Sequence, residues 1–346
     1  MKICIVGGIF DKSNEYRAKH RFTPETILFE GLSSKGFDVT AIGHRSFRPS
    51  DKFDIVHIHH LGKAVIRIAL TQTRSRFVFT GHNGNMLCGT EKSFKNRLAF
   101  KYVLNRADML VGLSEIECQY LRQFSGKNVQ VKKISNGIPS DFFQPFPREI
   151  ARTGQSYRIL FVGQLIPNKG VDDLFHAVNT IAQRIPWELI LVYQNSSQEN
   201  HFLEMAQKLG ITEHVNFLGF LSALELASMY RNVDVLVLPS YAESLPSVIT
   251  ESLLSGTPVV ATNVGGIPEQ IVSPFGELVP PGDWNELGAA LTRVYENLTS
   301  YRELAQEIHD FAASRFSIEQ MVNEHIQLYE AVLTQTQSRR FKSTGQ

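Results

Sequence analysis

The chain has 346 residues, of which 43% are hydrophobic and 20% are charged, and its formal net charge is +1. These values are ordinary for a folded globular protein, so they exclude a disordered, collagen-like or low-complexity chain. No apolar run approaches the roughly 18 residues that cross a bilayer. Three scattered cysteines without Cys-x-x-Cys spacing argue against a disulfide framework or a zinc site, and strand-like alternation predicts that Cys4 packs in the core. At about 150 residues per domain, the length predicts two domains.

Short β-branched runs alternate with longer amphipathic segments in the first half of the chain. The pattern predicts strands at 2–6, 39–42, 55–59, 77–80, 109–111 and 129–134, and helices at 24–34, 62–71, 93–105 and 114–124. Ser114 and Glu117 have the spacing of a capping box at the start of the last helix. This alternation is typical of right-handed βαβ units around a parallel sheet.

A proline-rich polar stretch at 139–156 interrupts this alternation and is predicted to link two domains. A second series follows, with strands at 158–162, 188–192, 215–217, 233–238 and 258–261 and helices that begin at Val171, Gln198, Ala223 and Ser247. Residues 318–333 form one more amphipathic helix, and the tail from Thr334 is expected to be frayed. The predicted fold class is α/β, with two tandem doubly wound, Rossmann-like domains whose ligands bind beyond the carboxyl ends of the strands.

The two halves of the chain carry opposite charge. Residues 1–150 hold 23 Lys and Arg against 13 Asp and Glu, whereas the remainder holds 12 against 21. Within 62–106, nine basic residues accompany a single acid, Glu91. This bias favours attraction to phosphates or anionic lipid, and the alternative is a set of solvated helix faces. No RNP-like string or zinc-finger spacing accompanies it, so nucleic acid is not an expected partner.

The segment 239–251 combines an anion site with two acids. Pro246 lies where a helix is predicted to begin, with Ser244 or Leu245 near its N-cap, and the backbone N–H groups of such a helix start suit a phosphate. Glu243 precedes this helix and Glu251 lies inside it. Because carboxylates accept hydrogen bonds from vicinal hydroxyls, ribose and hexose are natural ligands of the pair.

Histidines and glycines mark the strand ends of the first half. Gly7 and Gly8 allow close backbone approach to a ligand, but no Gly-x-Gly-x-x-Gly fingerprint follows, which weakens a nicotinamide-dinucleotide interpretation. His57, His59 and His60 resemble a metal cluster by count, yet strand alternation directs His60 away from the other two.

Several motifs, in order along about residues 2–333, resemble those of retaining family 4 glycosyltransferases with the GT-B fold. They are 54–60 (DIVHIHH), 79–83 (FTGHN), 135–139 (SNGIP), 163–170 (GQLIPNKG), the Glu243-x₇-Glu251 spacing, 256–262 (GTPVVAT) and 265–269 (GGIPE). The resemblance implies two domains facing a cleft: an acceptor-side domain at 1–150 and a nucleotide-sugar domain at 151–316. At 317–346 we expect a C-terminal helix that crosses back to the first domain, followed by the frayed tail.

The resemblance also implies residue roles. Lys169 is expected to grip the donor diphosphate, Glu251 the ribose hydroxyls, and Glu243 and His82 to lie near the transferred hexose. The other donor-binding positions that it implies are Gly8, Gln164, Gly219, Ser244, Leu245, Pro246 and Ser247. Gln164 departs from the family's usual Arg and supplies no charge. Tyr193-Gln194-Asn195-Ser196 replaces a usual Gly-x-Gly-Pro turn, and the polar segment 11–22 replaces a short loop.

The expected activity is transfer of a hexose-type sugar from a nucleotide-sugar to an acceptor hydroxyl on a glycan or lipid-linked molecule, with retention. Glu243, Lys169 and His82 are the expected catalytic residues. No Asp-x-Asp occurs, and neither a metal nor another cofactor is expected. The expected location is cytoplasmic and peripheral on an anionic inner membrane face.

Three alternatives remain open at this point. A GT-B epimerase would release altered sugar without an acceptor. A non-catalytic relative that binds a partner would tolerate the Gln164 replacement and the lost turn. A nicotinamide-dependent dehydrogenase fits tandem βα units, although the missing fingerprint counts against it.

Overall fold

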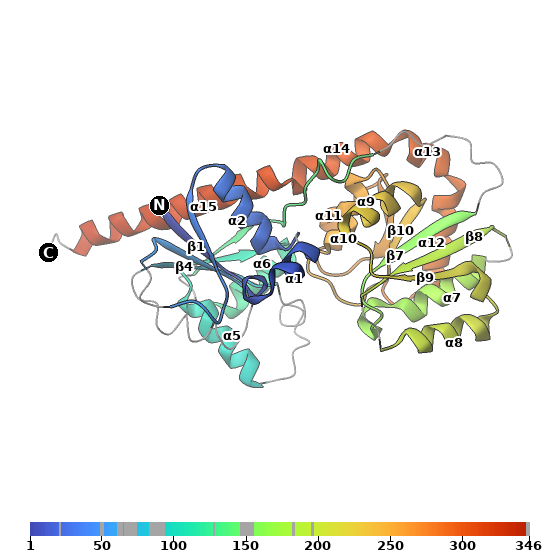
Figure 1. The fold of residues 1–346 in the computed structure, drawn as a ribbon, viewed down its shortest axis with the longest axis horizontal. Coiled ribbons are helices and arrows are strands. Elements are labelled where there is room, and N and C mark those ends of the chain that lie inside the picture. Colours follow the sequence, from blue (N-terminus) through green and yellow to red (C-terminus); the bar gives the residue numbers. More distant parts are fainter. Residues whose placement is uncertain are drawn as a thin grey trace. The chain divides into compact units, whose positions relative to one another are not determined.

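A computed structural model describes residues 1–20, 22–48, 52–60, 65, 75–82, 94–126, 129–145, 156–181, 184–194 and 197–343. The chain divides into two compact units, each visible in Figure 1. Unit 1 comprises Met1–Ile138 together with Phe316–Gln346, and unit 2 comprises Pro139–Arg315. The C-terminal segment therefore belongs to the same unit as the N-terminal segment.

Six parallel strands form the sheet of unit 1, in the order β2-β1-β3-β4-β5-β6. The strand order reverses between β1 and β3, which is the switch point at which doubly wound sheets bind ligands. All six strands fall on predicted ones, because most of them are short apolar runs that both faces of the sheet bury. Their bounds are Lys2–Val6 (β1), Asp38–Ile42 (β2), Ile55–His59 (β3), Arg76–Thr80 (β4), Met109–Gly112 (β5) and Gln130–Lys133 (β6).

Helices cover both faces of this sheet. Alternate strand residues divide between two cores: Cys4 and Val6 pack with α5 and α6, and Ile3 and Ile5 pack with α2 and α15. The described helices of unit 1 are η1 (Gly8–Asp11), α1 (Asn14–Lys19), α2 (Pro24–Ser34), α5 (Phe94–Arg106), α6 (Glu115–Phe124) and α15 (Ile318–Ser343). The predicted helix at 62–71 lies outside the described residues except for position 65.

The last helix, α15, completes unit 1. Met321, Val322, Leu328 and Tyr329 are buried against the core that contains α2. A Cβ at Gly31 of α2 would overlap Val322 Cγ2, so this glycine permits the close approach of the two helices. The helix continues to Ser343, whereas a frayed tail was predicted from Thr334; no glycine or proline interrupts 334–343, so no sequence signal ends it there.

Unit 2 repeats the design, with six parallel strands in the order β12-β11-β10-β7-β8-β9. Its switch point lies between β7 and β10. The strand bounds are Tyr157–Val162 (β7), Trp187–Val192 (β8), Val215–Gly219 (β9), Val235–Leu238 (β10), Val259–Thr262 (β11) and Gly276–Val279 (β12). The predicted fold class, two doubly wound Rossmann-like units, is thereby confirmed.

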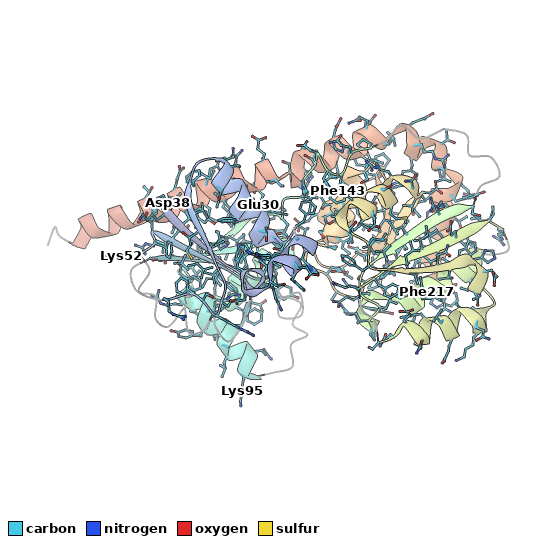
Figure 2. The ribbon with its side chains drawn as sticks, viewed as in Figure 1. Glu30, Asp38, Lys52, Lys95, Phe143 and Phe217 are labelled. Atoms are coloured by element: carbon cyan, nitrogen blue, oxygen red, sulfur yellow. The ribbon has the colours of Figure 1, made fainter. Side chains whose placement is uncertain are left out.

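The helices of unit 2 include all four that were predicted after residue 156. Aromatic rings fill the core beneath two of them: the ring of Phe175 on α7 lies 5.5 Å from that of Phe202 on α8 and 6.5 Å from that of Phe217 on β9. Phe217 is labelled in Figure 2. The bounds are η2 (Pro167–Lys169), α7 (Val171–Ile181), α8 (Glu199–Leu209), η3 (Thr212–His214), α9 (Ala223–Asn232), α10 (Ser247–Leu254), α11 (Ile267–Gln270), α12 (Trp284–Glu296), α13 (Leu298–Glu303) and α14 (Ala305–Phe316).

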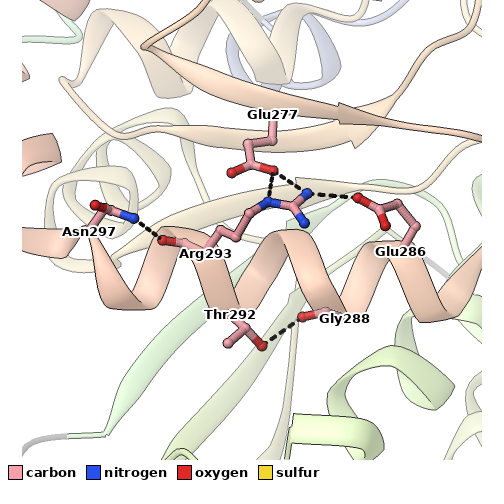
Figure 3. A network of polar contacts seen from close by, with 6 residues as sticks. All are labelled: Glu277, Glu286, Gly288, Thr292, Arg293 and Asn297. Carbon is pink, nitrogen blue, oxygen red and sulfur yellow. Dashed lines mark hydrogen bonds and ion pairs between the residues drawn. The ribbon is translucent and has the colours of Figure 1, made fainter.

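Strand β12 and helix α12 were not predicted, and a polar network joins them (Figure 3). Arg293 on α12 donates from Nε and Nη2 to Glu277 Oε2 on β12, at 2.8 and 2.6 Å, and from Nη2 to Glu286 Oε1 at 2.8 Å. The network fixes the edge strand, which buries only Val279 fully.

Within the described part of the chain, no helix is both long enough and apolar enough to cross a membrane.

Candidate functional site

A tight loop after β7 places Lys169 at the switch point of unit 2. The η2 turn ends at Gly170, whose φ is +64°, and a Cβ at this position would overlap the carbonyl oxygen of Pro239. Tyr241 N donates to Asn168 O at 2.9 Å, and Asn168 Nδ2 donates to Ala242 O at 3.2 Å. The loops that follow β7 and β10 are therefore joined by a backbone and a side-chain hydrogen bond, at a close approach that only glycine at position 170 allows.

Lys169 and Glu243 form a half-buried ion pair between these loops. Nζ lies 2.5 Å from Glu243 Oε1, and the two side chains are 22% and 11% exposed. Ser240 Oγ donates to the same carboxylate oxygen at 2.8 Å, and Thr262 Oγ1 donates to Ser240 O at 2.5 Å. The ammonium group is thus fixed at the carboxyl edge of the sheet, where it is able to contact an anion.

The start of helix α10 adds backbone donors beside this pair. Pro246 is the N-cap, with φ −67° and ψ 122°, and no side-chain cap and no acid lies in the first turn. Ser244 and Leu245 therefore lie directly before the cap, which agrees with the prediction that one of them lies near it. The unpaired N–H groups and the helix dipole favour an anion at Ser247.

A glycine turn holds the 243–246 loop. Gly265 has φ +55°, and a Cβ there would overlap the Glu243 carbonyl oxygen. Gly266 N donates to Ser244 O at 2.8 Å, and Gln270 Nε2 donates to Pro246 O at 3.0 Å. The motif at 265–269 therefore shapes the loop through its backbone.

Glu251 lies on the next turns of α10 and is half-buried. Tyr230 OH donates to its Oε2 at 2.9 Å. Burial raises the pKa of the Glu251 carboxyl above its ordinary value of 4.5, against the opposing hydrogen bonds of Tyr230 and Ser247. The side chain is held by its neighbours in the position from which the resemblance implies ribose binding.

Two predicted donor residues stand apart from the ion pair. Gln164 follows β7 with an exposed side chain, and no contact among the described residues joins it to Lys169 or Glu243. Gly219 ends β9 with φ +68°, and its carbonyl accepts from Tyr193 N at 3.0 Å. The structure therefore brings together Lys169 and Glu243, with Ser244–Ser247 and Glu251 on the same segment.

His82 lies at the carboxyl edge of unit 1. Its Nε2 is 2.9 Å from His59 Nδ1, and its ring centroid is 4.5 Å from that of His60. Burial lowers the pKa of His82 to about 3, so the ring is neutral at neutral pH. Gly8 begins η1, and a Cβ there would lie 3.7 Å from His44 Cδ2.

His57 belongs to a structural network. Its Nδ1 is 2.6 Å from Tyr329 OH on α15, and its Nε2 is 2.7 Å from Thr80 Oγ1. Both ring nitrogens are therefore occupied, and burial lowers the pKa of His57 well below 6.5. No group of three side chains in the described ranges is placed to hold a metal ion.

Sequence reasoning missed Glu25, His44 and His325 as members of the histidine cluster. The ring of His325 lies 5.4 Å from that of His57. His44 and Glu25 are coupled electrostatically to each other and to His60. Their positions far apart in the chain carry no spacing signal, because only the sheet order brings them together.

Two family models match adjoining parts of the chain: Glycosyltransferase Family 4 at residues 15–142 and Glycosyl transferases group 1 at residues 143–311. The chain belongs to the family 4, or group 1, glycosyltransferases. This confirms the resemblance that the motifs suggested.

Individual proteins are also similar to this chain. D-inositol 3-phosphate glycosyltransferase of Mycolicibacterium smegmatis is 28% identical over 83% of this chain and 69% of that relative. Sucrose-phosphate synthase of Thermosynechococcus elongatus is 20% identical, with TM-score 0.78 over 96% of this chain and 99% of that one. Anabaena Alr3699/HepE, solved in complex with UDP-glucose, is 19% identical, with TM-score 0.77 over 96% of this chain and all of that one (100%). At these identities the solved structures establish a shared fold.

Proposed function

We propose that this glycosyltransferase moves a hexose-type sugar from a nucleotide-sugar donor to an acceptor hydroxyl on a glycan or lipid-linked molecule, with retention and without a metal. The observation that carries the proposal is the Lys169–Glu243 pair at the switch point of unit 2, beside the start of α10. A fixed cation and unpaired backbone N–H groups are the donors that a diphosphate needs.

In this proposal unit 2 binds the donor. Lys169 and the N–H groups at Ser247 stabilise the negative charge that develops on the departing diphosphate. Glu251 accepts hydrogen bonds from the ribose hydroxyls, and the backbone near Gly219 contacts the base. Glu243 positions the sugar and needs no covalent bond to it, because the departing phosphate is able to take the proton of the acceptor hydroxyl. His82 and Gly8 of unit 1 are assigned to the sugar.

Helix α5 supports an anionic membrane as a further partner. Its exposed side chains include Lys95, labelled in Figure 2, and Arg97 and Lys101. Leu98 and Tyr102, one turn apart, are 52% and 40% exposed. The helix has no acidic residue. Exposed apolar side chains among cations are suited to the interface of an anionic lipid layer.

Gln164, which supplies no charge for a diphosphate, favours one alternative, a non-catalytic relative that binds a partner or scaffolds an assembly. Calorimetry with UDP, GDP and ADP separates the cases, because a scaffold protein would bind none of them.

The decisive experiment is a screen of UDP-, GDP- and ADP-sugars for hydrolysis without acceptor and for transfer to glucose, inositol and their phosphate esters. Release of nucleoside diphosphate with anomeric retention in the product is the expected result. Neither hydrolysis nor transfer with any donor would contradict the proposal, and altered sugar released without acceptor would indicate an epimerase.

A further inference from the structure

The switch point of unit 1 holds a carboxylate–imidazole pair that the family motifs do not assign. Strands β1 and β3 are neighbours there, so Gly7 after β1 and His60 after β3 lie at the same sheet edge. Glu25, in the first turn of α2, reaches this edge. His60 Nε2 lies 3.4 Å from Glu25 Oε1.

The side chain of Glu25 is buried in a space that the absence of a side chain at Gly7 leaves free. Its side chain is 3% exposed, and a Cβ at Gly7 would lie 2.5 Å from Glu25 Cγ and 3.0 Å from Oε1. Any residue other than glycine at position 7 would displace the carboxylate. Glu25 Oε2 is buried and has no hydrogen-bond partner within the described ranges, nor do His44 Nδ1 and His59 Nε2 of the histidine cluster. Buried polar atoms without a hydrogen-bond partner are costly, and the three at this sheet edge mark it as a candidate functional site.

His60 is presented by an unusual backbone conformation. Its φ is +67°, and it is the one non-glycine residue with positive φ in the part of the chain that the structure describes. This conformation costs free energy for a residue with a Cβ, and such outliers cluster at functional sites. His60 N donates to Thr80 O at 3.2 Å, which ties the distorted backbone to β4. The side chain is 40% exposed, so the imidazole is accessible while Glu25 behind it is not.

The charges around the pair define what it binds. Burial acts to raise the pKa of Glu25, but the hydrogen bond and charge of His60 outweigh it, so the pKa lies below 4.5 and the group is ionised at neutral pH. Burial lowers the pKa of His59 well below 6.5, and that of His82 to about 3. The edge therefore offers one buried negative charge, which repels a phosphate, and the neutral rings of His59 and His82, which are able to take part in hydrogen bonds with hydroxyl groups.

We propose that His60 binds the attacking hydroxyl of the acceptor through Nδ1, and that the reacting end of the acceptor is an uncharged sugar or polyol. In this proposal Glu25 is the positioning residue, because its carboxylate holds the Nε2–H of His60 toward itself. The inference rests on the proposed function, since it places the acceptor in unit 1. No hydrogen bond to His60 Nδ1 exists among the described residues, so its lone pair is free to accept from the hydroxyl. The proton of that hydroxyl leaves with the diphosphate, and His60 orients the oxygen.

The first test uses the whole chain without ligand. In ¹⁵N-histidine NMR, the ring proton that His60 directs toward Glu25 is expected on Nε2, and Glu25→Gln is expected to shift the tautomer ratio and the His60 resonances. A His60 with its proton on Nδ1, or an unchanged spectrum in E25Q, would overturn the positioning role.

The second test separates acceptor binding from chemistry. With the best acceptor of the screen above, His60→Ala is expected to raise the acceptor KM about tenfold, the loss of one hydrogen bond, and to change the KM of the nucleotide-sugar less than that of the acceptor. His60→Gln, which keeps an acceptor atom, is expected to recover part of the affinity. The matched control is His201→Ala, because His201 forms a pair with Asp172 at 2.9 Å that is exposed on unit 2.

The outcomes distinguish failure of the acceptor role of His60 from failure of the proposed glycosyltransferase function. Turnover with an unchanged acceptor KM in both His60 variants would refute the acceptor role and leave the glycosyltransferase function intact. The substrate class would be refuted if the protein used a phosphorylated acceptor better than its uncharged counterpart, in a case where the phosphate ester is on the carbon next to the reacting hydroxyl. Absence of nucleotide-sugar turnover in the unmodified protein would refute the proposed function, and the tautomer measurement would still decide the pairing.

Discussion

Lys169 and Glu243 lie 74 positions apart in the chain, and their side chains meet with Nζ 2.5 Å from Oε1. A diphosphate that reaches the ammonium must therefore share it with a carboxylate that is already in place. The pair fixes the orientation of the Lys169 side chain before a ligand binds, but the Glu243 carboxylate then competes with the ligand for the ammonium group.

Removal of either partner is expected to impair turnover. Lys169→Ala removes the cation and Glu243→Ala removes the group that positions the sugar, so each should lower kcat at least about 100-fold, as loss of one transition-state donor does. Steady-state release of nucleoside diphosphate measures this. Lys208→Ala, at an exposed lysine on α8, is the control. Near-normal turnover in both site variants would refute their roles.

Gln164→Arg is expected to tighten nucleotide binding. The side chain is exposed after β7, so an arginine fits without repacking, and a charge-assisted hydrogen bond to a diphosphate should lower the Kd of UDP, GDP or ADP about tenfold. Calorimetry measures the change. Gln164→Glu, of similar size and opposite effect, should weaken binding; equal affinities for the two variants would show that position 164 does not face the phosphates.

Alanine substitutions at two glycines with positive φ distinguish the cost of backbone strain from the cost of steric overlap. Gly210 has φ +69° and open space around a Cβ, so Gly210→Ala should cost only about 1 kcal/mol of unfolding free energy. Gly265 has φ +55° and a carbonyl oxygen in the way, so Gly265→Ala should cost about 3 kcal/mol or more. Urea unfolding of unit 2 gives both values, and similar losses would show that the 243–246 loop moves aside.

The buried histidines of unit 1 predict acid sensitivity. Burial lowers the pKa of His325 to about 4, whereas the unfolded chain titrates near the ordinary value of 6.5. Between these values the unfolded state binds the proton and the folded state does not. The free energy of unfolding therefore decreases by about 1.4 kcal/mol for each unit by which the pH is lowered, for this group.

Unfolding midpoints at pH 7, 6 and 5 would measure the slope, which His325→Gln should reduce. The contribution is complete above pH 6.5 and is lost as pH falls toward 4. An identical slope in the variant would show that His325 is already protonated in the folded chain.

Anionic vesicles test the lipid-facing role of α5. Each cation near such a surface contributes about 1 kcal/mol, so reversing Lys95, Arg97 and Lys101 to Glu together should weaken binding about 100-fold or more. Sedimentation with phosphatidylserine vesicles at two salt concentrations measures this, and Lys208→Glu on unit 2 is the matched control. Vesicle binding that changes neither with salt concentration nor with the three charge-reversing substitutions would exclude an electrostatic interface on this helix.

Most of the fold could be predicted because its strands are short buried runs. β1 and β3 match their predicted bounds, since both are short runs rich in Ile and Val that the sheet buries. Strand β12 was missed because Gly276–Val279 is an edge strand with one fully buried residue. Helix α12 carried a readable signal: Asp283 accepts from Glu286 N at 3.0 Å as its N-cap, and Leu287, Ala290, Leu291 and Val294 form its buried face.

The capping prediction at Ser114 was half right. Ser114 Oγ accepts from Glu117 N at 3.3 Å, but Glu117 Oε2 accepts from Leu113 N at 2.6 Å, one residue before the cap. Spacing identified the helix start, and the local backbone decided which N–H the acid reaches.

The site was only partly predictable. Motif spacing named Lys169 and Glu243, but their contact follows from sheet order, which places β7 beside β10. Glu25 and His60 had no signal as a pair, because their meeting depends on a positive φ and on a glycine that makes room for a carboxylate.

The contribution of α15 to unit 1 has a consequence for synthesis on the ribosome. Unit 2 is contiguous and is able to fold as soon as it emerges, whereas the sheet face around Ile3 and Ile5 is only partly covered, by α2, until α15 is translated. The nascent first half therefore exposes apolar surface throughout the translation of the second, and chaperones have that interval in which to bind it.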